Sequence, residues 1–267
     1  MIWTTRPRSN LATLRAICAG HGPRIVLLHG VGLRAEAWNP VIDALVEHGY
    51  QVIAPDMPGH GSPPMQLADV AAYAEVIRRA LPEDGCPTVC IGHSMGAMIA
   101  LDLAENSPEA ACGVVAVNAV FNRSPAASRA VVKRAETLDG RRLPDPAPTL
   151  QRWFGEWPSA ERERCERWLT SVDAKGYQQA YRCFASARIP SHQSLQNLQC
   201  PSLFVTGAQD PNSTAEMSQH MAKIAPNGHA EIIQDAAHMM PMTHAAQLIP
   251  ILLPFLETCF DGHYPPD

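Results

Sequence analysis

Short apolar runs alternate with longer helical stretches from Arg24 onward, and this alternation constrains the fold more than any other feature of the sequence. The apolar runs predict strands at 24–28, 51–54, 88–91, 113–117, 202–205 and 230–233. The segments between them predict helices at 35–47, 67–81, 94–106, 213–224 and 243–257, the last interrupted or kinked by Pro250 and Pro254. Such an order is typical of an α/β protein with a mostly parallel central sheet and helices on both faces.

The alternation stops between residues 122 and 198, where the sequence becomes rich in helical segments and prolines. We interpret 122–198 as a helical cap inserted into a core domain that residues 1–121 and 199–267 form together. A chain of 267 residues is long enough for one such domain. Residues 2–4 and 11–16 could add two antiparallel strands at the sheet edge.

Composition and charge exclude several classes of function. The formal net charge is −5 and no run of Lys or Arg could follow a phosphate backbone, so we expect no nucleic-acid partner. No apolar stretch reaches the length of a membrane span, and Arg6, Arg8 and Asn10 stand where a signal peptide needs apolar residues. We therefore expect a cytoplasmic protein with no membrane partner.

Eight scattered cysteines favour buried free thiols over a disulfide framework. Cys86 and Cys90 lack the second pair of ligands that a zinc site requires. We expect no metal and no organic cofactor, and the sequence leaves the oligomeric state open.

The sharpest chemical signal is the pentapeptide at 92–96, Gly-His-Ser-Met-Gly, which follows a predicted strand and begins a predicted helix. This is the G-x-S-x-G nucleophile elbow in the context that it requires. A side chain at Gly92 or Gly96 would collide with neighbouring backbone, and Ser94 would be held in a strained conformation above the sheet. A plain Gly-Ser turn that caps a helix is the weaker interpretation.

Two backbone N–H groups are candidates for an oxyanion hole, in which one donor is typically worth roughly 10² to 10³ in rate. Met95 directly follows the nucleophile. Val31 follows His29-Gly30 at the end of an earlier predicted strand.

The acid and the base should follow the nucleophile in the chain in the order acid, then histidine. Asp210 follows the strand at 202–205, and His238 follows the strand at 230–233, so both should reach the carboxyl edge of the sheet near Ser94. For the acid, Asp56 and Asn118 are weaker alternatives, and His244 is the alternative base. Asp210 could instead cap a helix, although Asn212 and Ser213 can do so themselves.

These motifs together resemble the α/β-hydrolase superfamily over nearly the whole chain. The matching residues are His29-Gly30, Asp56-Met57-Pro58-Gly59-His60-Gly61, the pentapeptide around Ser94, Gly207-Ala208-Gln209-Asp210 and His238. Within it, the sequence looks like the capped branch of serine esterases, enol-lactonases and carbon–carbon bond hydrolases. The resemblance implies an α/β-hydrolase fold, and it implies a mainly structural role for Asp56 and His60. Ala97 departs from relatives that carry a second glycine there.

We expect hydrolysis of a small carboxylic ester, lactone or thioester through an acyl-enzyme on Ser94. Cleavage of a carbon–carbon bond in a diketone-like substrate, a lyase reaction, or ligand binding without catalysis remain alternatives. Aromatic residues of the cap and residues beside the catalytic motifs are candidates for the pocket wall. They are Trp38, Trp153, Trp157, Tyr181, Arg182 and Met239.

Overall fold

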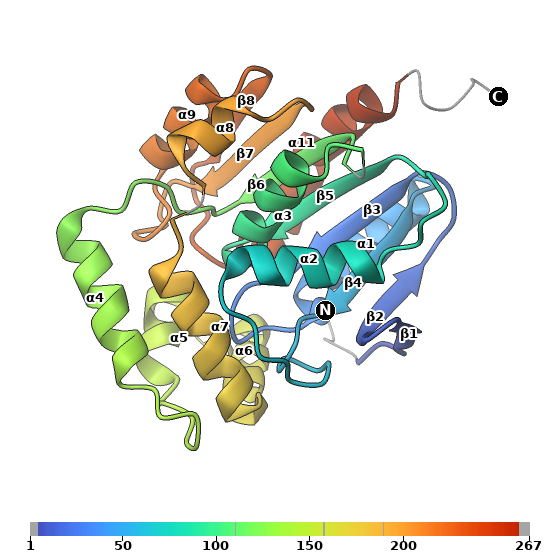
Figure 1. Cartoon of the computed structure of the whole chain (residues 1–267). Helices are drawn as coiled ribbons and strands as arrows, with labels where there is room; N and C mark the ends of the chain where they lie inside the picture. The colour runs from blue at the N-terminus through green and yellow to red at the C-terminus, as the bar shows by residue number, and fades with distance from the viewer. Residues whose placement is uncertain (1–4, 110, 157, 189, 262–267) are drawn as a thin grey trace.

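An eight-stranded sheet forms the centre of the molecule in the computed structural model, which describes residues 5–109, 111–156, 158–188 and 190–261 (Figure 1). The strands lie in the order β1-β2-β4-β3-β5-β6-β7-β8. The first two pairs, β1 with β2 and β2 with β4, are antiparallel, and all other neighbours are parallel. The strands are β1 (Ser9–Leu11), β2 (Leu14–Ala19), β3 (Arg24–Leu28), β4 (Gln51–Asp56), β5 (Thr88–His93), β6 (Gly113–Val117), β7 (Ser202–Gly207) and β8 (Gly228–Ile233). The predicted α/β-hydrolase fold is confirmed.

The antiparallel edge differs from its prediction. Residues 2–4 lie outside the described residues, and the first strand is β1 instead. Ala12 has a φ of +50°, which turns the chain between β1 and β2. The prediction of a continuous strand over 11–16 is therefore wrong, because this segment spans the end of β1, the turn and the start of β2.

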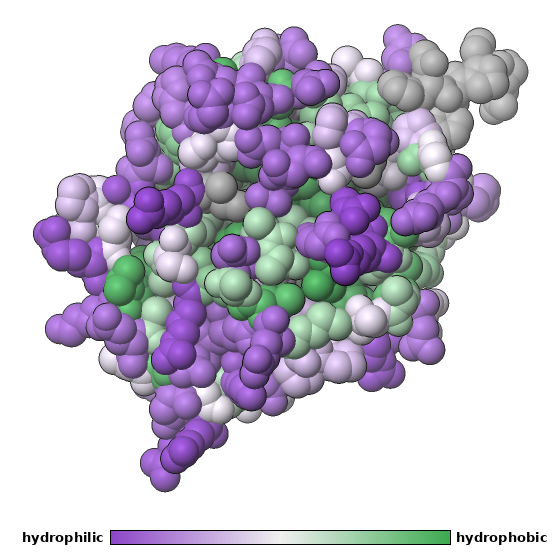
Figure 2. Space-filling view, in the orientation of Figure 1, coloured by the Kyte–Doolittle hydropathy of each residue, from purple (hydrophilic) through white to green (hydrophobic). Residues whose placement is uncertain are grey.

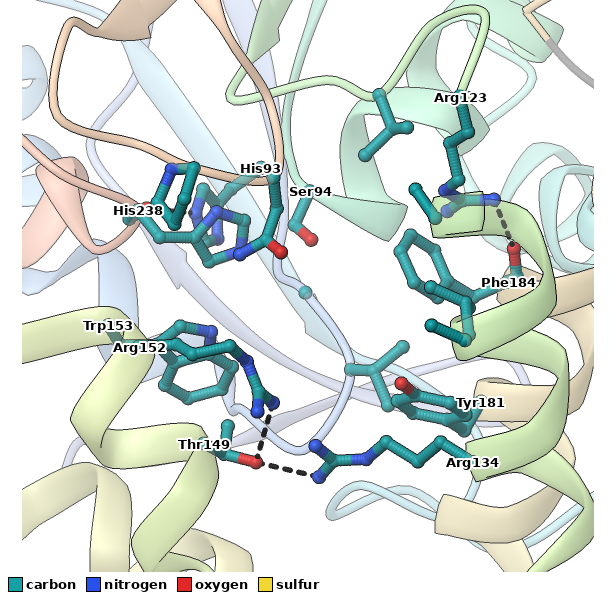
Figure 3. A pocket seen from close by; sticks show the side chains of 18 of the residues that line it. His93, Ser94, Arg123, Arg134, Thr149, Arg152, Trp153, Tyr181, Phe184 and His238 are labelled. Atoms are coloured by element: carbon teal, nitrogen blue, oxygen red, sulfur yellow. Dashed lines mark hydrogen bonds between the residues drawn. The ribbon is translucent and has the colours of Figure 1, made fainter. Parts of the chain in front are cut away.

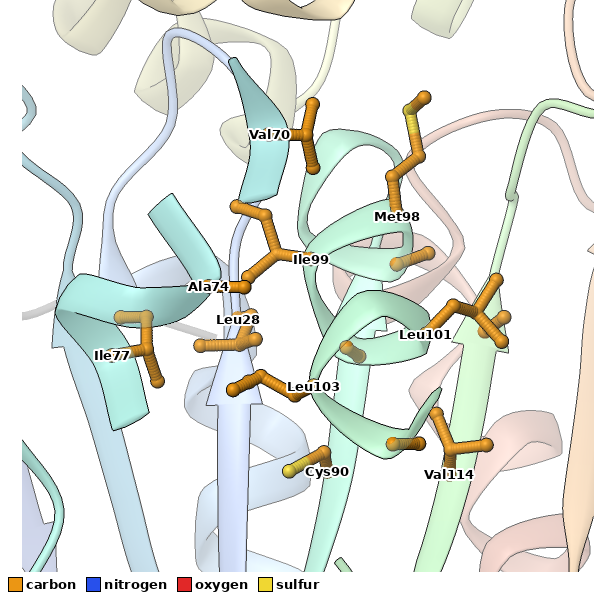
Figure 4. Packing of buried hydrophobic residues seen from close by; sticks show 14 of the residues in the cluster. Leu28, Val70, Ala74, Ile77, Cys90, Met98, Ile99, Leu101, Leu103 and Val114 are labelled. Carbon is orange, nitrogen blue, oxygen red and sulfur yellow. The ribbon is translucent and has the colours of Figure 1, made fainter. Parts of the chain in front are cut away.

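Successive residues of the parallel strands point to opposite faces, and each face has its own apolar core. Val26, Leu28 and Cys90 pack on one side, beneath α2 (Val70–Ala80), α3 (Met95–Asn106) and α9 (Ala215–Ile224), as Figure 4 shows for α2 and α3. Ile25 and Leu27 pack on the other side, beneath α1 (Asn39–Glu47) and α11 (Ala245–Phe260). The helices thus fix the strand ends that carry the candidate site.

Helix α11 continues through Pro250 and Pro254, which the sequence analysis expected to kink or break it. The two prolines lie four residues apart on the exposed side of the helix. The carbonyl groups that they leave without an N–H donor therefore face water, which can satisfy them. Two short helices complete this part of the fold, η1 (Ala35–Trp38) and α10 (Met240–Thr243).

Five helices lie between β6 and β7 in the described residues: α4 (Pro125–Glu136), α5 (Ala147–Phe154), α6 (Ala160–Ser171), α7 (Ala174–Ser186) and α8 (His192–Gln196). Figure 1 shows α4 to α7 gathered beyond one end of the sheet, and we call these four helices the cap. Helix α8 instead packs against α3 and α9. An apolar cluster that includes Leu150 and Trp168 of the cap and Leu33 and Met242 of the core holds the two parts together.

Polar residues cover much of the face seen in Figure 2, with an apolar area across its middle where Figure 1 shows α2. No helix of the described residues is both long and apolar enough to cross a membrane. All eight cysteines are free thiols, as expected, but only five of them are buried: Cys86 and Cys112 are partly buried and Cys18 is exposed.

Candidate active site

Ser94 lies in the sharp turn between β5 and α3, with φ +57° and ψ −117°. This conformation is strained for a residue with a side chain, and the surrounding structure must hold it. The Ser94 N–H donates to Val117 O in the neighbouring strand at 2.9 Å, which ties the turn to the sheet. The predicted strained conformation of Ser94 is confirmed.

Glycine is required at two positions around this turn and favoured at a third. A Cβ on Gly92 would overlap the Gly96 carbonyl, and a Cβ on Gly96 would overlap the Leu28 carbonyl. A Cβ on Gly30 would lie 3.1 Å from the Ser94 Cβ, so the loop after β3 approaches the elbow more closely than a larger residue permits comfortably. Both glycine collisions predicted from the sequence are present.

Asp210, at the end of β7, holds His238 through a hydrogen bond of 2.7 Å from His238 Nδ1 to Asp210 Oδ2. The same carboxylate accepts from Asn118 Nδ2 at 2.8 Å and from the backbone N–H groups of Asn212 and Ser213 at 2.9 and 3.2 Å. Burial alone would raise the pKa of Asp210, but attraction to His238 and these hydrogen bonds outweigh it and keep the pKa below its ordinary value. Asp210 is therefore an ionised partner for the histidine.

His238 and Ser94 line the same cavity, and the Ser94 hydroxyl points into it (Figure 3). Among the hydrogen bonds of the described residues, none joins Ser94 Oγ to His238. Catalytic hydrogen bonds of this kind often tighten only when substrate binds. The structure thus brings Ser94 and His238 to one cavity at the carboxyl edge of the sheet, and it places Asp210 behind His238, bonded to the far side of its ring.

Two aromatic neighbours position the His238 ring. His93 Nε2 donates to the His238 carbonyl oxygen at 2.7 Å, so the proton of His93 lies on that nitrogen. Burial, followed by the nearby His238, lowers the pKa of His93 to about 3, so His93 is uncharged at neutral pH. Trp153 of the cap stacks on the His238 ring with centroids 5.8 Å apart and an interplanar angle of 26°.

The two candidate oxyanion donors lie beside the elbow. Met95 is the first residue of α3, where an N–H has no partner within the helix. Val31 lines the cavity in the turn after β3, and neither N–H donates in the backbone hydrogen bonds found outside helices and strands. His29 fixes this turn because its Nε2 accepts from Met57 N at 2.9 Å.

Of the weaker alternatives, Asp56 and His244 have other partners, and Asn118 supports Asp210. Asp56 accepts from Arg8 and from Ala35 N, and it holds the N-terminal segment against the core. His244 lies between α10 and α11, and its Nε2 is 3.7 Å from an Asp235 carboxylate oxygen. Asn118 contacts the acid but supplies an amide N–H rather than a charge.

The cavity has a volume of about 490 Å³ and lies between the strand ends and the cap. Trp153 and Tyr181 line it as expected, and Trp157 lies outside the described residues. Three other predictions for the pocket wall are wrong. Trp38 is fully buried below the site with its ring edge against His93, Met239 is buried among apolar residues beneath the cap, and Arg182 is exposed on α7.

Three arginines that the sequence analysis did not identify line the cavity: Arg123, Arg134 and Arg152. Arg134 and Arg152 both donate to Thr149 Oγ1, and no Asp or Glu is among the described residues that line the cavity. No group of His, Cys, Asp and Glu that could hold a metal ion occurs in the described part of the chain.

The fold is that of an α/β hydrolase. The chain belongs to the alpha/beta hydrolase family, which it matches over residues 25–251. It is 38% identical over 265 residues to the (E)-2-((N-methylformamido)methylene)succinate hydrolase of Acinetobacter baylyi, covering 97% of this chain and 99% of the relative. It is 29% identical to the pimeloyl-[acyl-carrier protein] methyl ester esterase of Xanthomonas oryzae over 253 residues, or 90% and 97% of the two chains. A hydrolase from Pseudomonas aeruginosa has the same fold, with a TM-score of 0.84, 20% identity and coverage of 93% and 98%.

Proposed function

We propose that this protein is a serine hydrolase that cleaves an acyl bond of a small substrate through a covalent intermediate on Ser94. The observation that carries the proposal is the arrangement around one cavity of a strained, cavity-facing serine and a histidine bonded to an ionised aspartate. A turn that served only to cap a helix would need neither the strained serine nor the buried histidine–aspartate pair.

In the proposed reaction, Ser94 Oγ attacks the substrate carbonyl carbon while His238 Nε2 accepts the hydroxyl proton. Asp210 holds the proton on His238 Nδ1 and stabilises the imidazolium. The N–H groups of Val31 and Met95 donate to the oxyanion. His238 then protonates the leaving group and activates a water molecule, which hydrolyses the acyl-enzyme and restores Ser94.

The relatives bear on the bond that is cleaved. The Xanthomonas relative is named for a methyl ester, and the Acinetobacter relative is named for a compound that combines an N-methylformamido group with a succinate. Esters and amides share the attacked carbonyl group and differ in the leaving group. We therefore extend the proposed substrates from esters, lactones and thioesters to amides of small carboxylic acids.

A fluorophosphonate probe tests the nucleophile directly, because it reacts with an activated serine whatever the natural substrate is. We expect labelling of the wild type and of Ser186→Ala, which changes an exposed serine on α7. We expect no labelling of Ser94→Ala. Labelling that persists in Ser94→Ala, or a wild type that is folded and unlabelled, would refute the proposal and favour a ligand-binding role.

A substrate panel separates the two enzymatic alternatives. We expect turnover of p-nitrophenyl esters and of N-formyl amides by the wild type, with no turnover of vinylogous diketones. The reverse pattern would identify a carbon–carbon bond hydrolase built on the same three residues.

A further inference from the structure

Arg134 and Arg152 form a cationic pair on one side of the cavity without a carboxylate partner. Arg134 Nη2 and Arg152 Nη2 donate to the same Thr149 Oγ1, at 2.7 and 3.3 Å. Neither takes part in any salt bridge among the described residues. Burial lowers the pKa of Arg152, and the charge of Arg134 lowers it further, so the two guanidinium groups repel each other. An anion bound between them would relieve that repulsion.

Arg123 places a third guanidinium group elsewhere on the cavity wall. It lies over the Phe184 ring, 4.3 Å from the centroid, and its Nη1 donates to the Phe184 carbonyl oxygen at 3.4 Å. Its Nη2 is buried and has no hydrogen-bond partner. A buried cationic N–H without an acceptor is costly, so this group should gain an acceptor when a ligand is present.

The two cationic positions are separate. Figure 3 shows Arg134 and Arg152 flanking Thr149, while Arg123 lies with Phe184 in another part of the wall and Ser94 faces the space between them. Because no acidic side chain is among the described lining residues, the protein itself does not neutralise either position. A neutral ligand would leave all three guanidinium groups without an anionic partner, and a monoanion would supply a partner to only one of the two positions.

We propose that the cavity binds a small dicarboxylate, with one carboxylate held by Arg134 and Arg152 and the other by Arg123. Guanidinium groups match carboxylates through paired N–H donors, which fixes orientation as well as charge. Ser94 faces the space between the two anchors, so a ligand held at both ends would present its middle to the Ser94 hydroxyl. This assignment rests on the proposed function only for the reaction at Ser94, because binding of the two carboxylates does not need the hydroxyl.

Calorimetric titration of Ser94→Ala with succinate and glutarate tests the proposal without catalysis. Butyrate serves as the monocarboxylate comparison and succinamide as the uncharged one. We expect at least one of the two dicarboxylates to bind at least about tenfold more tightly than butyrate, and succinamide to bind most weakly. Equal affinity for the dicarboxylates and succinamide would overturn the proposal.

Substitutions in the Ser94→Ala background assign the anchors. We expect Arg123→Gln to lower dicarboxylate affinity to about that of butyrate, and the double change Arg134→Gln with Arg152→Gln to do the same. Arg129→Gln removes an exposed arginine from α4 that does not line the cavity, and it should leave the affinity unchanged. Loss of affinity in the Arg129 variant equal to that in the others would indicate a general charge effect and overturn the assignment.

The two proposals fail in distinguishable ways. Tight binding of a dicarboxylate to Ser94→Ala together with an unlabelled wild type would retain the anchors and reject the serine mechanism. Fluorophosphonate labelling of the wild type together with no preference for dicarboxylates would retain the serine mechanism and reject the anchors.

Discussion

The Asp210 carboxylate accepts four hydrogen bonds, and they come from four different residues. Only the bond from His238 involves a proton that the proposed reaction needs in a fixed position. The bonds from Asn118, Asn212 and Ser213 keep the carboxylate ionised and aimed at the histidine. Asn118 is itself fully buried, on the strand-end loop next to that of Asp210.

Asp210→Asn should reduce kcat by roughly 10³ to 10⁴ with little change in fold, because an amide no longer selects the His238 tautomer. Asn118→Ala removes one of the four donors and should cost a smaller factor of about 10. Steady-state kinetics on a reactive ester, together with circular dichroism, measures both. If Asn118→Ala lowered kcat as much as Asp210→Asn does, the expected order of the two effects would be wrong.

Gly92→Ala should destabilise the protein by at least about 2 kcal/mol, because the added methyl group meets the rigid backbone of Gly96. Gly49→Ala is the comparison: Gly49 has a φ of +80° but no atom lies within 4 Å of an added Cβ, so the cost should be about 1 kcal/mol. Urea denaturation measures the difference. If the two alanine variants lost equal free energy of unfolding, the backbone around Gly92 would be able to shift more easily than its geometry indicates.

The sequence predicted those site residues whose positions depend on strand ends. Ser94, Asp210, His238 and Val31 each follow a parallel strand within a few residues, and parallel strands end at one edge. The positions of Arg134 and Arg152 in the cavity wall could not be predicted in this way, because they depend on how the cap helices α4 and α5 are rotated. No motif or strand end marks either arginine in the sequence.

Among the elements, α7 is fixed against the core by a contact between two glycines. A Cβ on Gly176 would lie 2.5 Å from the Gly59 Cα in the turn after β4. Helix α7 also carries Tyr177 and Tyr181 into the cavity wall. The distance between these two backbones therefore sets the position of part of the wall.

Gly176→Ala should push α7 away from that turn, lower the free energy of unfolding by about 1–3 kcal/mol and raise KM more than it lowers kcat. Thermal denaturation and steady-state kinetics provide the two readouts. Glu166→Ala, an exposed change on α6, is the control. Unchanged stability and KM in Gly176→Ala would mean that the cap adjusts freely.

Periodicity located the elements but not all of their boundaries. Helix α2 begins at Val70 rather than at 67, because the Asp69 side chain caps it by accepting from Ala72 N. The division of the chain into a core and a cap at 122 and 198 remains a prediction. The structure adds that α8, inside the predicted cap, packs with the core helices.

At the scale of the whole molecule, three buried histidines of the described residues are uncharged at neutral pH. Burial, as the largest cause, lowers the pKa of His29 to about 4 and the pKa values of His60 and His93 to about 3. Their unfolded values lie near 6.5, so the unfolded chain binds protons first as the pH falls. The stability that depends on these histidines is complete above about pH 6.5 and is lost as the pH falls toward 3–4. Asp102 acts in the opposite direction, because burial raises its pKa to about 6.

Between pH 7.5 and 5.5 we therefore expect the free energy of unfolding to fall by about 3 kcal/mol. Protonation of the three histidines in the unfolded chain lowers it by about 4 kcal/mol, and protonation of Asp102 in the folded protein raises it by about 1 kcal/mol. Urea denaturation at several pH values measures the slope. His60→Asn should reduce the dependence of the free energy of unfolding on pH by about a third. His48→Gln replaces an exposed histidine and is the control, which should leave that dependence unchanged. A flat profile in the wild type would contradict the buried, uncharged state of these side chains.

Because Trp153 stacks on the His238 ring, its fluorescence should depend on the charge of that histidine. A protonated imidazole quenches the emission of an indole that it touches, whereas a neutral imidazole does so far less. Trp38 contacts His93, which stays neutral down to about pH 3, and so contributes little to such a change. The difference in fluorescence between the wild type and Trp153→Phe should therefore follow the charge on His238, and it should also change when a ligand separates the two rings.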